Sequence, residues 1–195
     1  MSSQTATHQH GINSISTFGF WIFVLSDFIL FATLFTSYVV LSPHTYGSIG
    51  VRQTAGLNYV FVQALLMLAA CLTYGFGIFS MHRNQKGITQ FWLLVTFLFG
   101  LGFTLMQWHV FSTLYSAGYT WHDSAFLSIF YTLLAAHWFH VIVGLLWTAI
   151  IFIQLFLQPL TTTMKTRLTC LGIFWVFLNI IWVVIFTVVY LMGAI

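Results

Sequence analysis

Hydrophobic residues in this chain form long continuous runs separated by short polar connectors. A helix that crosses a bilayer needs ~20 mostly apolar residues, and five runs reach that length. The predicted spans cover about residues 18–41, 57–81, 91–114, 126–157 and 168–192. This pattern predicts an all-α polytopic membrane protein, a bundle of five transmembrane helices. A polar N-terminal arm over residues 1–17 precedes a single membrane domain over residues 18–195.

The composition excludes a water-soluble domain. Of the 195 residues, 60% are hydrophobic and only 4% are charged, and the mean hydropathy is +0.98. Ordinary globular proteins carry about a quarter charged residues, and a soluble domain with so few would expose a large apolar area and aggregate. The net charge of +3 is no sign of nucleic-acid binding, which requires a clustered basic surface.

The positions of the cations predict how the chain is oriented. Arg83 and Lys86 lie in the second connector, and Lys165 and Arg167 lie in the fourth, whereas the first and third connectors together contain only Arg52. Cytoplasmic connectors carry an excess of Lys and Arg. We therefore expect the N-terminus in the cytoplasm and, after five spans, the C-terminus in the periplasm.

Two stripes of small or polar side chains predict close packing between helices. They are Gly19, Ser26 and Thr33 on the first span, seven residues apart, and Ala136, His140, Gly144 and Thr148 on the fourth, four residues apart. Small side chains let a neighbouring backbone approach, which favours helix association in lipid.

Asp27 is the acidic residue that lies at membrane depth. It is nine residues into the first span, about 13 Å at 1.5 Å per residue, and an acid at a helix centre costs ~2.5–3.5 kcal/mol on insertion scales. Its side chain must therefore face protein or trapped water. One interpretation is a proton-relay or lipid-contact residue, and the other is an interhelical hydrogen bond that fixes the geometry of the bundle.

Histidine and glutamine side chains complete the candidate intramembrane polar network. His137 and His140 are three residues apart on one face of the fourth span, and Gln63 and Gln107 lie within the second and third spans. Hydrogen-bonded packing or phospholipid contact is the first interpretation. The alternatives are a small b-type membrane cytochrome that uses His109 with His137 or His140 as haem ligands, or a small transporter.

The sequence offers no motif for catalysis. It contains no glycine-rich phosphate loop, no nucleophile elbow and no second carboxylate within a span to pair with Asp27. We therefore expect no catalytic, cofactor-binding or metal site in this chain, which is typical of an accessory subunit.

Several short motifs, taken in order, resemble one known family. They are Phe18-Gly19-Phe20-Trp21 with Ser26-Asp27, then Thr73-Tyr74-Gly75, then His137-x-x-His140-Val141-x-x-Gly144, then Phe174-Trp175 with Trp182, and the ending Phe186 to Ala194. In this order, on five spans, the chain resembles subunit III of haem-copper respiratory oxidases in the quinol-oxidase (cytochrome o) branch.

The resemblance implies an accessory, cofactor-free subunit packed against the catalytic subunit I, together with subunits II and IV. The haems and copper are then expected in the partner, which oxidises quinol, reduces oxygen to water and pumps protons across the bacterial cytoplasmic (inner) membrane. It also implies bound phospholipid in a cleft between helices. The subunit is expected to support assembly and stability of the complex, and no nucleic acid is expected as a partner.

The chain departs from the family pattern at its acids. The family's Trp-His-Phe-x-Asp in the last helix is here Trp175-Val176-Phe177-Leu178-Asn179, and Gln63 stands where related oxidases have Glu. Acids common on the third helix are replaced around Gln107. These replacements favour a structural and lipid-binding role over a role in proton supply.

Overall fold

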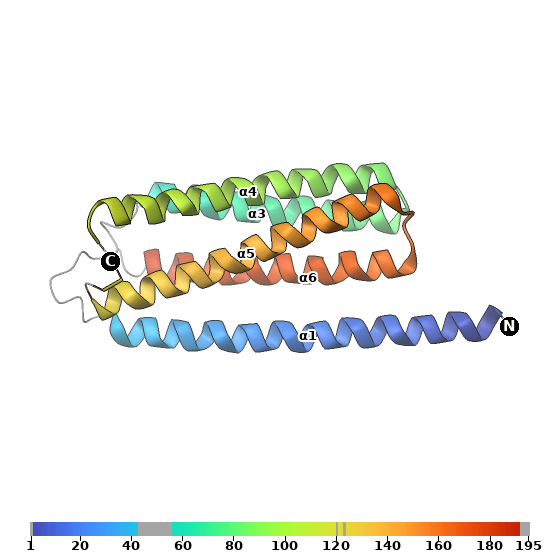
Figure 1. Ribbon diagram of the computed structural model, residues 1–195, viewed down its shortest axis with the longest axis horizontal. Coiled ribbons are helices and arrows are strands. Elements are labelled where there is room, and N and C mark those ends of the chain that lie inside the picture. The colour runs from blue at the N-terminus through green and yellow to red at the C-terminus, as the bar shows by residue number, and fades with distance from the viewer. Residues whose placement is uncertain (1, 43–55, 120, 123, 192–195) are drawn as a thin grey trace.

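The computed structural model describes residues 2–42, 56–119, 121–122 and 124–191, and this part of the chain is helical without strands (Figure 1). The helices are α1 (Ser2–Leu41), α3 (Leu57–His82), α4 (Lys86–Ser116), α5 (Ala125–Leu157) and α6 (Thr162–Ile185), with the π-helical turn η1 (Phe186–Leu191) continuing α6. Five helices are long and apolar enough to cross a membrane. The predicted fold class is confirmed.

The helices extend beyond the apolar runs at several ends. Helix α4 begins five residues before the predicted run, and α6 begins six residues before it. The Thr161 side chain accepts a hydrogen bond from the backbone N–H of Met164 and caps α6, and Ser124 caps α5 in the same way through Leu127. Such caps satisfy backbone donors that have no partner within the helix. Helix α1 likewise continues through the segment predicted as a polar arm.

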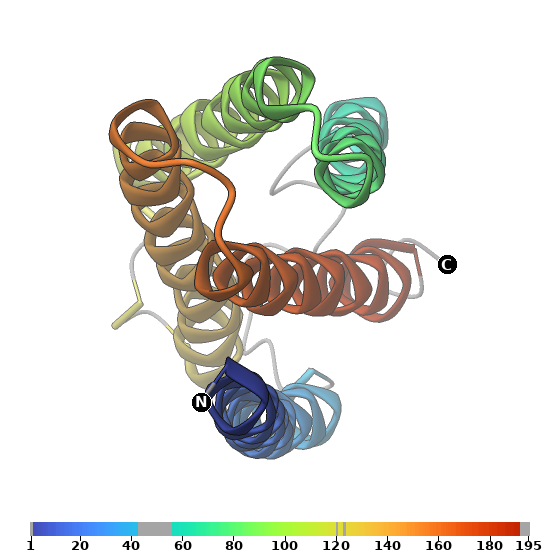
Figure 2. The same cartoon turned by 90° about the vertical axis from the view of Figure 1, so that its right-hand side faces the viewer.

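Helix α6 lies in the middle of the bundle and α1 lies at its edge (Figure 2). Helix α6 contacts α1, α3 and α5, while α4 packs on α3 and α5. Helix α1 packs on α5 and α6. In its most apolar stretch only 11% is buried, against 50% in that of α6. The four helices after α1 therefore form the main body, and α1 is attached to one side of it.

A stripe of large side chains, and not of small ones, attaches α1. Its fully buried residues are Val24, Phe31 and Tyr38, again seven residues apart. The predicted stripe of Gly19, Ser26 and Thr33 is exposed, and nothing lies within 4 Å of a Cβ built on Gly19. The prediction of close packing along that stripe is therefore wrong for contacts within this chain. Two residues are about 200° around a helix, so the sequence offered stripes on opposite faces and the apolar one is used.

The small-residue stripe on α5 does pack closely, as predicted. A Cβ built on Gly144 would lie 3.2 Å from Cε1 of Phe174 on α6. One turn further on, the buried Thr148 hydroxyl accepts a hydrogen bond from the Trp175 indole N–H at 3.2 Å and donates to the Gly144 carbonyl at 2.7 Å. Helices α5 and α6 therefore meet along this stripe.

The tightest glycine contact lies between α4, α5 and α6. A Cβ built on Gly100 would lie 2.8 Å from both Leu145 Cδ2 and Trp175 Cη2. Atoms this close must shift, and Trp175 is fully buried. Gly102, on the same helix, has only Leu66 Cδ1 at 3.9 Å, which is ordinary contact.

We expect Gly100→Ala to destabilise the bundle by ~1–3 kcal/mol, the usual cost of overpacking a filled core. Gly102→Ala is the matched control, and it is expected to be neutral or slightly stabilising because alanine favours a helix over glycine by ~1 kcal/mol. Denaturant titration of the purified protein in detergent micelles, followed by near-UV circular dichroism, measures both. Equal stabilities of the two variants would contradict the packing described for Gly100.

Candidate functional site

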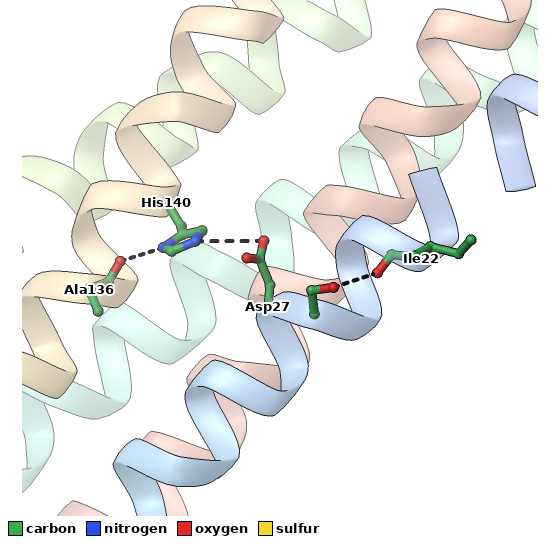
Figure 3. A network of polar contacts seen from close by, with 5 residues as sticks. Ile22, Asp27, Ala136 and His140 are labelled. Atoms are coloured by element: carbon green, nitrogen blue, oxygen red, sulfur yellow. Dashed lines mark hydrogen bonds and ion pairs between the residues drawn. The ribbon is translucent and has the colours of Figure 1, made fainter. Parts of the chain in front are cut away.

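Asp27 on α1 faces His140 on α5 (Figure 3). Their nearest atoms, Asp27 Oδ2 and His140 Nε2, are 3.7 Å apart, and the two side chains are 13% and 17% exposed. The other ring nitrogen of His140, Nδ1, lies 2.7 Å from the carbonyl oxygen of Ala136. Asp27 therefore has its partner across a helix interface, at mid-span.

The contact with Ala136 fixes which ring nitrogen of His140 carries a hydrogen. A carbonyl oxygen only accepts hydrogen bonds, so His140 Nδ1 donates to the Ala136 carbonyl at 2.7 Å. His140 Nε2 faces the Asp27 carboxyl at 3.7 Å, which is an ion-pair distance and longer than a hydrogen bond.

His137 is separate from this pair and fully enclosed. Its Nε2–H donates to the backbone carbonyl of Leu178 on α6 at 3.1 Å. Its ring lies against the rings of Phe103 and Trp182, with centroids 5.7 and 5.1 Å away. The bond to a carbonyl assigns the proton to Nε2 and leaves Nδ1 as an acceptor. His137 thus packs α5 against α6 by shape and by one hydrogen bond.

Gln63 and Gln107 are brought together between α3 and α4. The Gln63 side-chain amide donates to the Gln107 side-chain carbonyl at 3.2 Å, and both residues are almost fully buried. On the same interface, nearer the loop that joins α3 to α4, the hydroxyls of Thr73 and Thr96 lie 2.9 Å apart. The predicted polar network is therefore divided among several helix contacts and does not converge on one centre.

Sequence reasoning missed the aromatic side chains that carry polar tips. The buried Tyr74 hydroxyl donates to the carbonyl of Leu168 on α6 at 2.7 Å, and the Trp138 indole N–H donates to the carbonyl of Thr104 on α4 at 3.2 Å. Buried Tyr and Trp usually find such partners. In the sequence, Tyr74 and Trp138 stand within apolar runs, and their hydroxyl and indole N–H groups are the features that indicate hydrogen bonds.

The proposed haem ligands are not gathered around a common space. The exposed His109 packs against Tyr59, with ring centroids 6.0 Å apart, and its Nδ1 lies 3.5 Å from the Thr113 hydroxyl. His137 is enclosed between α4, α5 and α6, and His140 faces α1. In the described ranges no three His, Cys, Asp or Glu side chains come close enough to hold a metal ion.

An apolar groove of about 580 Å³ lies between α1, α3 and α6. Trp21 and Phe28 of α1, Gly75 of α3 and Gly172 of α6 are among its lining residues. Nothing lies within 4 Å of a Cβ built on Gly75, whereas a Cβ built on Gly172 would lie 2.9 Å from the Tyr74 ring. Val176 also lines it. The groove has the apolar lining and open side that suit the hydrocarbon chain of a lipid.

Comparison with known proteins identifies a family of membrane-protein subunits. The cytochrome c oxidase subunit III family matches residues 2–194. Subunit 3 of the cytochrome bo(3) ubiquinol oxidase of Pseudomonas aeruginosa is 42% identical over 187 residues, which are 96% of this chain and 90% of the relative. Subunit 3 of the Bacillus subtilis quinol oxidase is 33% identical over 192 residues, 98% and 94% of the two chains. Cytochrome c oxidase subunit 3 of a Bacillus species is 34% identical over 177 residues, 91% and 86% of the two chains.

The five apolar helices, together with the family match, make this chain a multi-pass membrane subunit of the respiratory oxidases. More particularly, the chain belongs to the cytochrome c oxidase subunit III family. This is the haem-copper oxidase family that its sequence motifs resemble. The names of its relatives are those of subunits of oxidoreductase complexes.

We expect His140→Leu to cost ~3–5 kcal/mol of stability, because it leaves a buried acid without its partner. In an Asp27→Leu background the same change should cost much less, since no acid remains to be stranded. Asp27→Asn should cost ~1 kcal/mol, because an amide can still donate to Nε2. Denaturant titration in mixed micelles of the single and double variants gives the coupling energy directly.

The matched control for this cycle is Ser26→Ala. Ser26 is exposed next to Asp27 and its hydroxyl donates within its own helix to Ile22, at 3.1 Å. Its loss should change stability by less than ~0.5 kcal/mol. If His140→Leu costs the same with and without Asp27, the Asp27–His140 contact does not stabilise the bundle and the interpretation is refuted.

Proposed function

We propose that this chain is the accessory, cofactor-free subunit III of a proton-pumping terminal quinol oxidase in the bacterial cytoplasmic membrane. Its partner subunit I oxidises quinol and reduces oxygen to water with its own haems and copper, and subunits II and IV complete the complex. In this proposal the chain contributes no catalytic residue. It supports assembly and stability of the catalytic subunit and binds membrane lipid.

What supports this role most directly is the use of the polar side chains at membrane depth. Asp27, His137 and Gln63 each contact another helix, and each contact joins a different pair of helices. A catalytic site needs several such groups converging on one reacting atom. Groups distributed one to an interface stabilise a bundle, which is the property required of a subunit that supports its neighbour.

The choice of quinol as electron donor rests on the relatives. The relatives with 42% and 40% identity are named as subunits of ubiquinol oxidases. One relative at 34% identity is named as a subunit of a cytochrome c oxidase. The two relatives at 40% identity or more therefore belong to the quinol branch, which is also the branch that the C-terminal motif resembles.

Lipid binding is assigned to the groove between α1, α3 and α6. Its walls are apolar, and the exposed rings of Trp21 and Phe28 can lie along a hydrocarbon chain. The intramembrane pair Asp27–His140 lies at the interface of α1 with α5 and keeps α1 in place beside the groove. We propose that lipid and polar pair together hold α1 to the main body.

Purification through an affinity tag on this chain tests the proposed role. We expect a large haem-containing subunit to co-purify in a fixed ratio, with the visible absorption of haem in the purified complex. The complex should oxidise a soluble quinol with oxygen uptake. A tagged chain that purifies without a haem protein, or that carries haem when isolated by itself, contradicts the proposal.

Asp27→Asn separates a structural role from a proton-transfer role. In the fully assembled complex we expect initial quinol oxidation close to wild type, because no reacting atom is touched. The thermal midpoint for retention of this subunit should fall by ~2–4 °C per kcal/mol lost. Ser26→Ala should change neither. Immediate loss of turnover with complete assembly would instead assign Asp27 a direct role in proton transfer.

A further inference from the structure

Four buried polar atoms in the main body have no hydrogen-bond partner among the described residues. They are Gln63 Oε1, Gln107 Nε2, His137 Nδ1 and Trp182 Nε1. Each of these residues is at most 1% exposed. A buried donor or acceptor without a partner costs free energy, so native proteins leave few of them unpaired. Four such atoms, one on each of four helices, therefore require an explanation.

Two of these atoms are acceptors and two are donors. The Gln63 amide nitrogen donates to the Gln107 carbonyl at 3.2 Å, which leaves the oxygen of one side chain and the nitrogen of the other. Turning both amides around leaves one oxygen and one nitrogen again. His137 Nε2 lies 3.1 Å from the Leu178 carbonyl, which only accepts, so Nδ1 is an acceptor. The indole nitrogen of Trp182 can only donate.

Three of the four side chains are gathered inside a ring of helices. Helices α3, α4, α5 and α6 each pack on the next, and α6 packs on α3 (Figure 2). Inside this ring the Phe103 side chain of α4 has its centroid 4.7 Å from that of Trp182 on α6 and 5.7 Å from that of His137 on α5. Gln107 follows Phe103 by four residues, which is one turn further on the same face of α4.

Gln63 on α3 lies at the same level. Helices α3 and α6 run in opposite directions (Figure 1). The Phe61 ring on α3 is 6.4 Å from that of Phe186, and Phe186 follows Trp182 by four residues. Gln63, two residues after Phe61, is therefore nearer to the level of Trp182 than Phe61 is. With the bond to Gln107, this places all four unpartnered atoms in one layer of the main body.

A layer with equal numbers of donors and acceptors suits a small neutral molecule that has both. The N–H groups of Gln107 and Trp182 would repel a bare cation, and the lone pairs of Gln63 and His137 would repel an anion. Water both donates and accepts, and a buried water makes about three hydrogen bonds to groups that have no other partner. Water is therefore the ligand that fits this set of atoms.

We infer that this layer binds a small cluster of internal water, about one or two molecules at about three hydrogen bonds each. The water accepts from Gln107 and Trp182 and donates to Gln63 and His137. Asn179 Oδ1, one turn before Trp182 on α6, is a further unpartnered acceptor at the edge of the layer. The cluster joins the glutamine pair of α3 and α4 to α5 and α6 by hydrogen bonds. The inference goes beyond the supporting role proposed above and does not depend on any partner subunit.

Radiolytic labelling tests for this water, because an X-ray pulse converts bound water to hydroxyl radicals that oxidise the side chains beside it. The full chain is irradiated in lipid nanodiscs, with any subunits that co-purify, and oxidation is quantified for each tryptophan by mass spectrometry. We expect Trp182 to be oxidised several-fold more than Trp175. Trp175 is the matched control, because it is also fully buried and its N–H already donates to the Thr148 hydroxyl at 3.2 Å.

Two double variants identify the residues that hold the water. Gln63→Leu/Gln107→Leu replaces the amides by apolar side chains of similar volume, and it should reduce oxidation of Trp182 to the level of Trp175. Thr73→Val/Thr96→Val removes another buried polar pair from the same two helices, whose hydroxyls bond to each other at 2.9 Å. It should leave oxidation of Trp182 unchanged.

The comparison within the wild type needs no variant and decides by itself whether water is present. Equal oxidation of Trp182 and Trp175 there would overturn the inference. Oxidation of Trp182 that persists in Gln63→Leu/Gln107→Leu would separate the water from the glutamine pair and overturn the shared site. A fall of the same size in Thr73→Val/Thr96→Val would show that any loosening of α3 and α4 changes the labelling, and it would also overturn the site.

Discussion

Hydrocarbon offers no hydrogen-bond partner, and this constraint determines how the helices are joined. A polar group at depth can find a hydrogen-bond partner only within protein. The resulting contacts join α1 to α5 through Asp27 and His140, α3 to α4 through Gln63 and Gln107, α3 to α6 through Tyr74, α4 to α5 through Trp138, and α5 to α6 through His137 and Trp175. Almost every packed pair of helices therefore has at least one polar contact that fixes its register, while apolar side chains fill the space between.

The same constraint makes α1 the helix most dependent on its surroundings. It buries three large side chains and one acid–histidine pair, and most of its surface faces outward. Between two apolar helices in lipid there is no hydrophobic driving force, so packing and polar contacts carry the association. Phe31 concentrates this packing, because its ring lies 5.3 Å from His140 and 6.0 Å from Phe177. A ligand in the adjacent groove adds contact area where the chain itself supplies little.

The sequence predicts those features that depend on neighbouring residues in the chain, and not those that depend on the partner helices. Span length and hydropathy are local properties, so the five helices were predicted correctly. Their starts were not, because α1, α4 and α6 begin before the apolar runs. Rotation of a helix is not local: Gly19, Ser26 and Thr33 and the buried stripe beginning at Val24 have the same spacing, and only the partner helices decide between them. For Asp27, the need for a partner was predictable from burial cost, but the choice of His140 depends on how α1 and α5 are rotated. The roles of Tyr74 and Trp138 required counting their polar tips separately from their apolar rings.

The distribution of charge also explains why this chain suits a supporting role. Within the described spans the one acid is Asp27, and His140 on α5 is its ion-pair partner at 3.7 Å. Val176 lines the apolar groove, and Asn179 of α6 is an uncharged side chain. Removing titratable groups from the interior lowers the cost of inserting and packing the helices, but it leaves few groups able to take up or release protons. Arg83, Lys86, Lys165 and Arg167 lie instead at one end of the bundle, where α3 ends and α4 and α6 begin.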